Sequence, residues 1–353
     1  MNRHSEVSVR SSLTRVLTVA LLVAACSGSD GSTPPASGDP GGTPDRTGDP
    51  VELVVGLGYI PSVQFAPFYL AQQEGYYEAA GLAIEFQNRI DPDLITLVGQ
   101  GTIDLGIGDG TSIIPAVSQG IPVRYLATVY GKFPSIVFAK ASSGIRSPAD
   151  LAGKKLGTPG RYGSGWITVQ AMLASAGLTE DDIEVVEYPD FGQGAAVAQD
   201  AVDAATGFAN NEPVQLELSG TPATVLRVDD IVPLPGPGLI AGVGTLEEQQ
   251  DAVQAFVVAT LQAMEEIAAD PERGLDAAIE AVPELGNDRD TQRAILEATI
   301  DTWRGPLQEE RGLGAVDRDG WAESIKFLEA RGFVPEPVTV DDVLRDDFLP
   351  AGD

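Results

Sequence analysis

The stretch from residue 51 to residue 86 constrains the fold most, because it alternates a strand, a loop, a helix and a second strand. Residues 51–57 form a short apolar run, and Pro67 suits the first turn of a helix, where a missing backbone N–H costs little. Gly75 can end that helix in the left-handed conformation. The pattern predicts a βαβ unit. In open α/β sheets, ligands bind at the loop between a strand's carboxyl end and the following helix.

The same α/β rhythm continues to about residue 228, and the remaining third of the chain is helical in pattern. The segment 130–134 has the character of a crossing into a second lobe. We therefore expect an α/β protein with two lobes, each a mostly parallel sheet flanked by helices. Lobe 1 is expected to comprise residues 51–131 and 233–353, and lobe 2 residues 132–232.

Two helix starts can be predicted from capping residues. Thr111 or Ser112 is placed to cap a helix over residues 113–119. Thr245 and Glu248 have the spacing of a capping box, which predicts one long helix up to Ala269.

The charge balance excludes one class of partner. The 353 residues include 22 Lys and Arg against 52 Asp and Glu, which gives a net charge of −30 and a pI of about 4.1. Such a protein repels nucleic acid and anionic lipid surfaces, so we expect no nucleic-acid function.

The histidine and cysteine counts exclude several kinds of chemistry. His4 is the only histidine and Cys26 the only cysteine. A mature protein without these two residues has no histidine general base, no thiolate nucleophile, no structural zinc site and no disulfide. We expect a protein without catalytic residues, metal or cofactor.

The N-terminus predicts export and lipidation. Several arginines precede an apolar run, residues 16–25, that is too short to span a membrane stably. Residues 23–26 (VAAC) resemble a bacterial lipobox, so residues 1–26 are predicted to be a signal peptide and Cys26 the lipidation site. Residues 27–50 have the Gly/Ser/Pro composition of a disordered tether. The alternative is an ordinary cleaved signal peptide with an incidental cysteine. We expect an extracytoplasmic protein anchored by lipid to the bacterial cell membrane.

Six short blocks follow one another in a characteristic order after residue 51: residues 61–82, 99–106, 119–122, 150–155, 202–213 and 348–350. In this order they resemble the type II periplasmic-binding-protein family, the substrate-binding components of ABC importers. The resemblance covers nearly all of the chain after residue 51. It is strongest to the branch that includes binders of thiamine pyrimidine precursors, riboflavin, nitrate and sulfonates.

That resemblance implies a type II periplasmic-binding-protein fold, in which two α/β lobes are joined by two crossover strands and close on a ligand like a hinge. Loops at strand carboxyl ends would supply the ligand contacts, and the corresponding residues here are Tyr59, Gln64, Phe65, Asp109, Thr111, Ser112, Tyr130, Lys132, Phe133, Arg161, Tyr162, Ser164, Trp166, Asn210, Asn211 and Glu212. Any one of these could instead be a structural turn or a packed aromatic.

The ligand is expected to be a flat and largely neutral heterocycle. Oxyanions need a cation in the cleft, and only Arg161 and Lys132 qualify, so nitrate and sulfonate are disfavoured. Aromatic rings and amides on the candidate loops suit stacking and hydrogen bonding. The segment 58–71 resembles riboflavin-importer binding proteins most, and a thiamine pyrimidine precursor is the second choice.

Three functional classes stay open at this point. The first is an importer protein that delivers its ligand to an ABC permease with its ATPase, and such a protein would be a monomer. The second is a sensor protein that presents the same ligand to a receptor. The third is a pyrimidine synthase, an enzyme relative of this branch, but that enzyme uses a histidine and a cysteine-rich motif that this chain lacks beyond residue 26.

Overall fold

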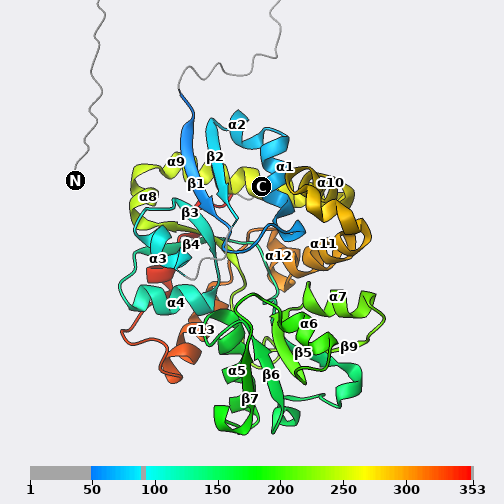
Figure 1. The fold of residues 1–353 in the computed structure, drawn as a ribbon. Coiled ribbons are helices and arrows are strands. Elements are labelled where there is room, and N and C mark those ends of the chain that lie inside the picture. Colours follow the sequence, from blue (N-terminus) through cyan, green and yellow to red (C-terminus); the bar gives the residue numbers. More distant parts are fainter. Residues whose placement is uncertain (1–48, 89–92, 351–353) are drawn as a thin grey trace, which may run out of the picture. The chain divides into compact units, whose positions relative to one another are not determined.

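The computed structural model describes residues 49–88 and 93–350, and the strands of this part form two five-stranded sheets (Figure 1). The expected signal peptide, Cys26 and nearly all of the expected tether lie outside the described residues.

The first sheet has the strand order β2-β1-β3-β10-β4. β1 pairs in parallel with β2 and β3, whereas β10 pairs antiparallel with both β3 and β4. β10 therefore completes the sheet although it comes much later in the chain than the other four strands. The strands are β1 (Val51–Gly56), β2 (Leu82–Gln87), β3 (Leu105–Gly108), β4 (Val123–Thr128) and β10 (Gly238–Gly242).

The second sheet repeats this arrangement with the order β7-β6-β8-β5-β9. β6 pairs in parallel with β7 and β8, and β5 pairs antiparallel with β8 and β9. All five strands come from one continuous segment of the chain. They are β5 (Ser135–Lys140), β6 (Lys155–Thr158), β7 (Glu184–Glu187), β8 (Ala204–Phe208) and β9 (Ala223–Arg227).

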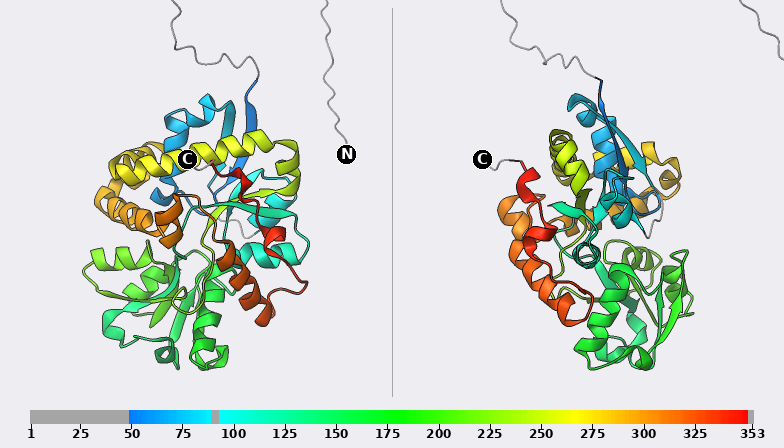
Figure 2. Two further views of the ribbon diagram at one scale, coloured as in Figure 1. Left: turned by 180° about the vertical axis from the view of Figure 1, so that it is seen from behind. Right: turned by 90° about the vertical axis from the view of Figure 1, so that its left-hand side faces the viewer.

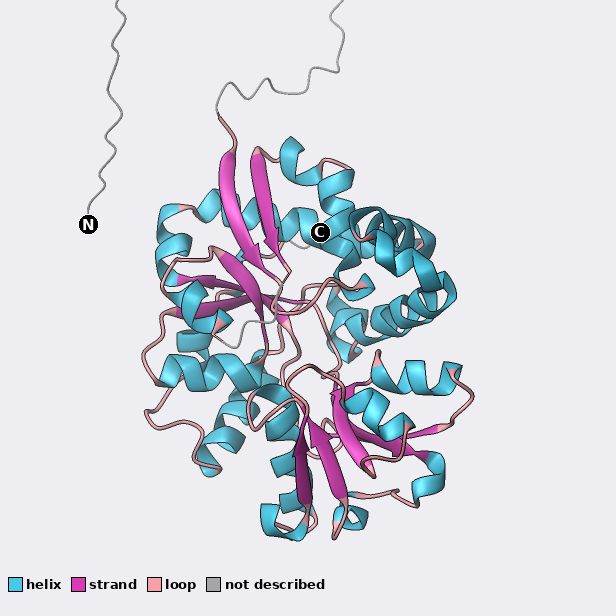
Figure 3. Ribbon diagram, viewed as in Figure 1, coloured by secondary structure: helices cyan, strands magenta, loops and turns pink. Residues whose placement is uncertain are grey.

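In each sheet four strands run in one direction and one runs against them, so both sheets are mostly parallel, and helices flank both (Figure 3). The chain passes from the first sheet to the second after β4 and returns after β9. This is the two-sheet α/β architecture with two crossings that the sequence predicts. The lobe boundaries at residues 131/132 and 232/233 stay predictions.

Helices from the C-terminal third cover the first sheet. The long helix α9 lies across it when the molecule is viewed from behind (Figure 2), and Phe256 of α9 stacks on Tyr77 with ring centroids 5.1 Å apart. By length and composition α9 could cross a membrane, but more than half of it is buried in the protein core. The α-helices are α1 (Ala66–Gln73), α2 (Tyr76–Ala79), α3 (Leu94–Gly99), α4 (Gly110–Ser118), α5 (Gly163–Ser175), α6 (Gln193–Ala198), α7 (Glu212–Leu218), α8 (Val243–Glu248), α9 (Gln250–Ala269), α10 (Pro271–Ala281), α11 (Arg289–Trp303), α12 (Pro306–Arg311), α13 (Arg318–Ala330) and α14 (Val340–Val343). The 3₁₀ helices are η1 (Val63–Phe65), η2 (Ala141–Ser143), η3 (Pro148–Leu151), η4 (Glu180–Asp182), η5 (Pro283–Asp288) and η6 (Asp346–Phe348).

The prediction of one long helix from Thr245 to Ala269 is wrong. The chain enters α8 directly from β10 at Gly242, so Thr245 lies inside α8 and does not cap it. The backbone then leaves the helical conformation at Gln249 (φ −133°, ψ 34°), and α9 begins at the next residue. A strand that ends at a helix start therefore overrides the local capping pattern.

Candidate functional site

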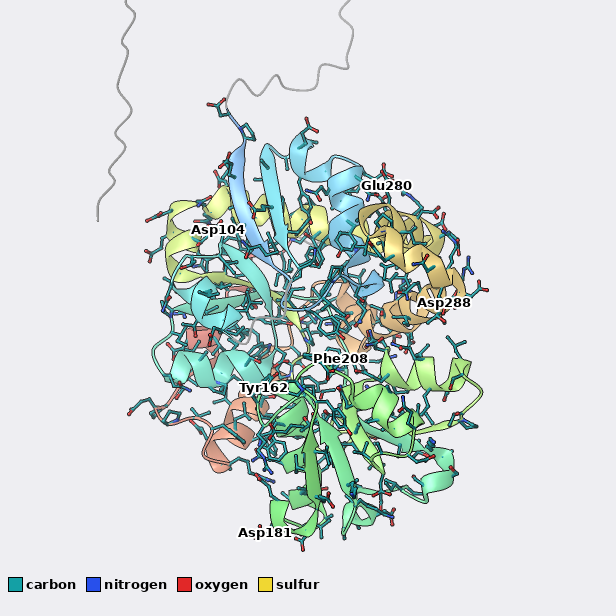
Figure 4. All side chains as sticks on the ribbon, viewed as in Figure 1. Asp104, Tyr162, Asp181, Phe208, Glu280 and Asp288 are labelled. Atoms are coloured by element: carbon teal, nitrogen blue, oxygen red, sulfur yellow. The ribbon has the colours of Figure 1, made fainter. Side chains whose placement is uncertain are left out.

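A cavity of about 330 Å³ lies where strand ends of the two sheets face each other. Its walls include residues that directly follow β1, β3 and β6 and the last residue of β8, so the cavity lies at the carboxyl ends of parallel strands from both sheets. Figure 4 labels Tyr162 and Phe208 at the edge of the second sheet that faces the first. The volume of the cavity is at the lower end of the range for small-molecule sites.

Ten of the sixteen predicted ligand contacts line this cavity. On the side of the first sheet these are Tyr59, Gln64, Phe65, Asp109, Ser112 and Tyr130, and on the side of the second sheet they are Tyr162, Ser164, Asn211 and Glu212. The structure thus brings together side chains that are up to 153 positions apart in the sequence (59 to 212). Whether each contacts a ligand stays a prediction.

The other six predicted residues do not line the cavity: Thr111, Lys132, Phe133, Arg161, Trp166 and Asn210. A second hollow of about 280 Å³ lies between α5 and α13, and its described lining includes none of the predicted residues.

The two candidate cations among these six are paired with carboxylates away from the cavity. Lys132 Nζ lies 2.9 Å from a carboxylate oxygen of Asp301. The guanidinium of Arg161 pairs with Glu180 and lies 3.5 Å from Glu187. Because both charges already have partners, neither is available as a free cation for an anionic ligand.

Two of the predicted aromatic contacts belong to the hydrophobic core. Phe133 is 2% exposed and Trp166 is 6% exposed, and both pack in the cluster beneath the second sheet. The sequence suggested a helix starting at residue 167, with Trp166 in the preceding loop. Helix α5 instead begins at Gly163, so Trp166 lies in its first turn and turns inward. Arg161 covers the outer face of that ring, with Cζ 4.9 Å from its centroid.

Asp109, rather than Thr111 or Ser112, is the N-cap of α4. One carboxylate oxygen of Asp109 accepts hydrogen bonds from the backbone N–H groups of Thr111 and Ser112, at 2.9 and 3.1 Å. The Thr111 hydroxyl also donates to this oxygen, at 2.6 Å, which turns it away from the cavity. Burial raises the pKa of Asp109, and these donors oppose the rise.

Glu212 is the second carboxylate in the cavity wall, and it comes from the side of the second sheet. It accepts a hydrogen bond from the backbone N–H of Phe208 at 2.8 Å. Burial raises the pKa of Glu212 to about 7. The pKa of the Tyr59 hydroxyl is raised to about 12, first because the side chain is buried and second because the charge of Glu212 is nearby.

An aromatic pair joins the two sides of the cavity. The rings of Tyr59 and Phe191 meet edge to face, with centroids 5.3 Å apart. The sequence analysis missed Phe191, which has a backbone φ of +60°. A bulky residue in this left-handed region is uncommon, and such strain often occurs at functional sites.

A buried hydrogen-bond network also joins the two sides. The side-chain nitrogen of Asn210 donates to Gln64 Oε1 at 2.9 Å and to Thr299 Oγ1 at 2.8 Å. The hydroxyl of Tyr130 reaches the same Gln64 oxygen at 3.5 Å. Asn210, although outside the cavity, therefore holds the Gln64 side chain that lines it.

The sequence analysis also missed four polar residues in the cavity wall on the side of the second sheet. They are nearly or completely buried: Ser135, Thr158, Gln193 and Thr206. None belongs to a recognisable motif, so only the fold could bring them together. With the carboxylate of Glu212, they make the side of the second sheet rich in hydrogen-bond acceptors.

The described lining of the cavity contains no histidine or cysteine side chain. Histidine and cysteine occur only at residues 4 and 26, outside the described part. Within residues 49–88 and 93–350, no cluster of three metal-binding side chains occurs. The arrangement can enclose a small planar molecule, pack aromatic rings against it and accept its hydrogen bonds.

Known proteins resemble this chain along most of its length. The family model described as NMT1/THI5 like matches residues 62–274. The riboflavin-binding protein RibY of Chloroflexus aurantiacus is 32% identical over 345 residues, which cover 96% of this chain and 98% of that protein. The formylaminopyrimidine-binding protein of Halalkalibacterium halodurans is 27% identical and covers 82% of this chain and 88% of its own length.

An enzyme is also among the relatives. The 4-amino-5-hydroxymethyl-2-methylpyrimidine phosphate synthase of Legionella pneumophila is 27% identical and covers 80% of this chain and 88% of its own length. Among solved structures, the alkanesulfonate-binding protein SsuA of Xanthomonas axonopodis pv. citri bound to MOPS superposes with a TM-score of 0.66 and 19% identity, covering 85% of this chain and all of that one. This likeness shows the periplasmic-binding-protein fold.

Proposed function

Because this chain belongs to the NMT1/THI5-like family, we propose that it is the substrate-binding protein of an ABC importer and that its ligand is riboflavin or a similar flat heterocycle. The observation that carries the proposal is the end-to-end similarity to a riboflavin-binding protein, which includes both sheets and therefore both sides of the cavity. The thiamine pyrimidine precursor is the second candidate, and the similarity to a formylaminopyrimidine-binding protein favours it.

The charges around the cavity support an uncharged ligand. The described walls contain the carboxylates of Asp109 and Glu212. The nearby cations of Lys132 and Arg161 are paired with carboxylates outside the cavity. A desolvated anion needs a cationic partner, so a sulfonate would meet repulsion here despite the shared fold.

The contacts across the cavity support a closing motion about the two crossings. Tyr59 packs on Phe191 and Gln64 bonds to Asn210, so segments that connect the strands of the two sheets contact each other directly. A ligand favours this closed arrangement only as far as its contacts with both sides exceed those with one side. The closed protein would then dock on a permease, and the associated ATPase would drive release.

We propose that the protein binds its ligand without changing it. The synthase relative makes catalysis the competing hypothesis. That enzyme class uses histidine and cysteine chemistry, and residues 27–353 of this chain contain neither residue type.

Lipid anchoring through Cys26 and a monomeric state complete the proposal, and a sensor role stays the alternative to import. A Cys26→Ser variant should move the protein from the membrane fraction to the medium if the cysteine carries the lipid. Persistent membrane association of this variant would contradict the anchor. A permease and an ATPase encoded beside this chain would favour import, whereas a kinase or cyclase would favour sensing.

Titration of the purified protein with riboflavin tests the ligand. Flavin fluorescence should be quenched with saturation at micromolar or lower concentration, and an alkanesulfonate should not compete. Arg161→Met is the matched control, because Arg161 lies beside the second sheet but outside the cavity. No quenching, combined with a thermal shift by 4-amino-5-hydroxymethyl-2-methylpyrimidine, would replace riboflavin by the pyrimidine. Turnover of either compound would overturn the binding-protein proposal.

A further inference from the structure

Gln193 is a buried amide in the cavity wall with one atom that has no partner. It begins α6, lines the cavity and is 2% exposed. Its side-chain nitrogen donates to the backbone carbonyl of Thr206 at 3.3 Å. Its carbonyl oxygen, Oε1, is buried and accepts no hydrogen bond. A buried acceptor without a donor is unfavourable and calls for an explanation.

The surroundings fix which end of the amide is unpaired. Rotating the amide by 180° would place Oε1 against the carbonyl oxygen of Thr206, so that two acceptors would face each other. The nitrogen must therefore face Thr206, and Oε1 is the atom left for a further partner.

The neighbouring hydroxyl groups do not supply the missing donor. The hydroxyl of Thr206 donates to Thr158 Oγ1 at 3.2 Å. The hydroxyl of Thr158 in turn donates to the carbonyl of Gly160 at 3.0 Å. Both protons are used in this chain of bonds, which leaves Gln193 as an acceptor in a wall already rich in acceptors.

We propose that Gln193 Oε1 accepts a hydrogen bond from a ring N–H of the ligand and thereby determines specificity. This inference rests on the proposed function, because it names how the same cavity recognises its heterocycle. The oxidised isoalloxazine ring of riboflavin carries a single ring N–H, at N3, beside its two carbonyl groups. A ligand with this donor satisfies the buried oxygen. A ligand without it leaves the oxygen unpaired, and such a site rejects the incomplete analogue strongly.

Riboflavin and 3-methylriboflavin, which differ at this N–H, test the proposal by fluorescence titration of the purified full chain. We expect the wild type to bind riboflavin about 10- to 100-fold more tightly than the methylated compound. In Gln193→Met, which has similar volume but no acceptor of this kind, the two affinities should approach each other. In Gln193→Glu, a protonated carboxyl group can donate to Thr206 and still offer an acceptor, so the preference should persist.

Gln170→Met is the matched control. Gln170 also has a buried, unpartnered Oε1 and a side-chain nitrogen that donates, here to Glu180 at 3.2 Å. It lies on α5 outside the proposed ligand cavity. Its replacement should leave the preference for riboflavin unchanged.

The outcomes separate this inference from the proposed function. Equal binding of both flavins by the wild type would overturn the inference while the proposed function stands, whether or not any variant folds. If a folded Gln193→Met variant still preferred riboflavin over 3-methylriboflavin as strongly as the wild type, the added methyl group would be excluded by its size. This result would also overturn the inference. Failure of riboflavin itself to bind would remove the proposed ligand and the inference together.

Discussion

Replacing Asn210 by leucine should measure the energy of the network that joins the two sides of the cavity. Asn210 is fully buried, and its side-chain nitrogen supplies hydrogen bonds to Gln64 and Thr299. Leucine has a similar volume but no donor, so the substitution removes both bonds without leaving a large hole.

The expected magnitude follows from what each acceptor retains. Gln64 Oε1 keeps only the hydroxyl of Tyr130 at 3.5 Å, which is a weak partner. Thr299 still donates to the carbonyl of Ile295 at 2.7 Å, so its loss is smaller. The substitution also removes the unpartnered Oδ1 of Asn210, which offsets part of the cost. Leaving one buried acceptor unpaired costs roughly 1–3 kcal/mol, and we expect a net loss in this range.

Two measurements locate this loss. Urea unfolding followed by circular dichroism gives the change in folding free energy of the ligand-free protein. Riboflavin titration gives the change in binding free energy, where each 1.4 kcal/mol is about a tenfold loss of affinity. If the network forms without ligand, stability falls; if it forms only on closure, affinity falls. Thr299→Val, which removes one of the two acceptors, should cost less in both assays. Unchanged stability together with unchanged affinity in Asn210→Leu would refute the reasoning.

Three further predictions concern single residues. Trp166→Ala should lower folding stability by about 3–5 kcal/mol, because the ring fills the core beneath the second sheet; a folded variant that loses only riboflavin affinity would contradict this placement. Arg161→Met should keep riboflavin affinity within about twofold and lower stability by less than about 1 kcal/mol, as for an exposed ion pair; a large affinity loss would place this guanidinium at the ligand. Burial raises the pKa of Glu212 from 4.5 to about 7, so the folded state binds this proton more tightly than the unfolded state, and stability should fall as pH rises through that window. Urea unfolding at pH 5 to 8 should therefore show that the stability of Glu212→Gln relative to the wild type increases up to about pH 7, by roughly 1–3 kcal/mol. Parallel curves of stability against pH for the two proteins would contradict the raised pKa.

The arrangement of strands and helices could be predicted because local signals agree with the fold. Gly75 and Gly81 both adopt positive φ, as a helix end and a tight turn require. β1 begins at Val51, where the apolar run that predicts it also begins. The helix break at Gln249 could not be predicted, because no proline or glycine marks the residue at which the backbone leaves the helical conformation.

The candidate site was less predictable, because charge pairing and burial depend on partners far away in the sequence. Lys132 pairs with Asp301, 169 positions later, so its identity as a cation did not reveal whether its charge was free. Gln193 belongs to no motif, and only its position beside Thr206 shows that its oxygen is unpartnered. The sequence also did not show which aromatic residues face the cavity, because a residue such as Trp166 suits a buried core as well as a ligand-stacking surface, and the structure places Trp166 in the core.

The position of β10 in the first sheet has a consequence for the order in which the chain folds. β10 separates β3 from β4, so β4 pairs with no other strand of that sheet. Until the ribosome has made residues 238–242, the N-terminal strands therefore cannot assemble completely. The strands at residues 135–227 form a self-sufficient set and can assemble first. We expect refolding to begin in the middle of the sequence, and a chain truncated before residue 238 to expose an unpaired strand edge that promotes aggregation.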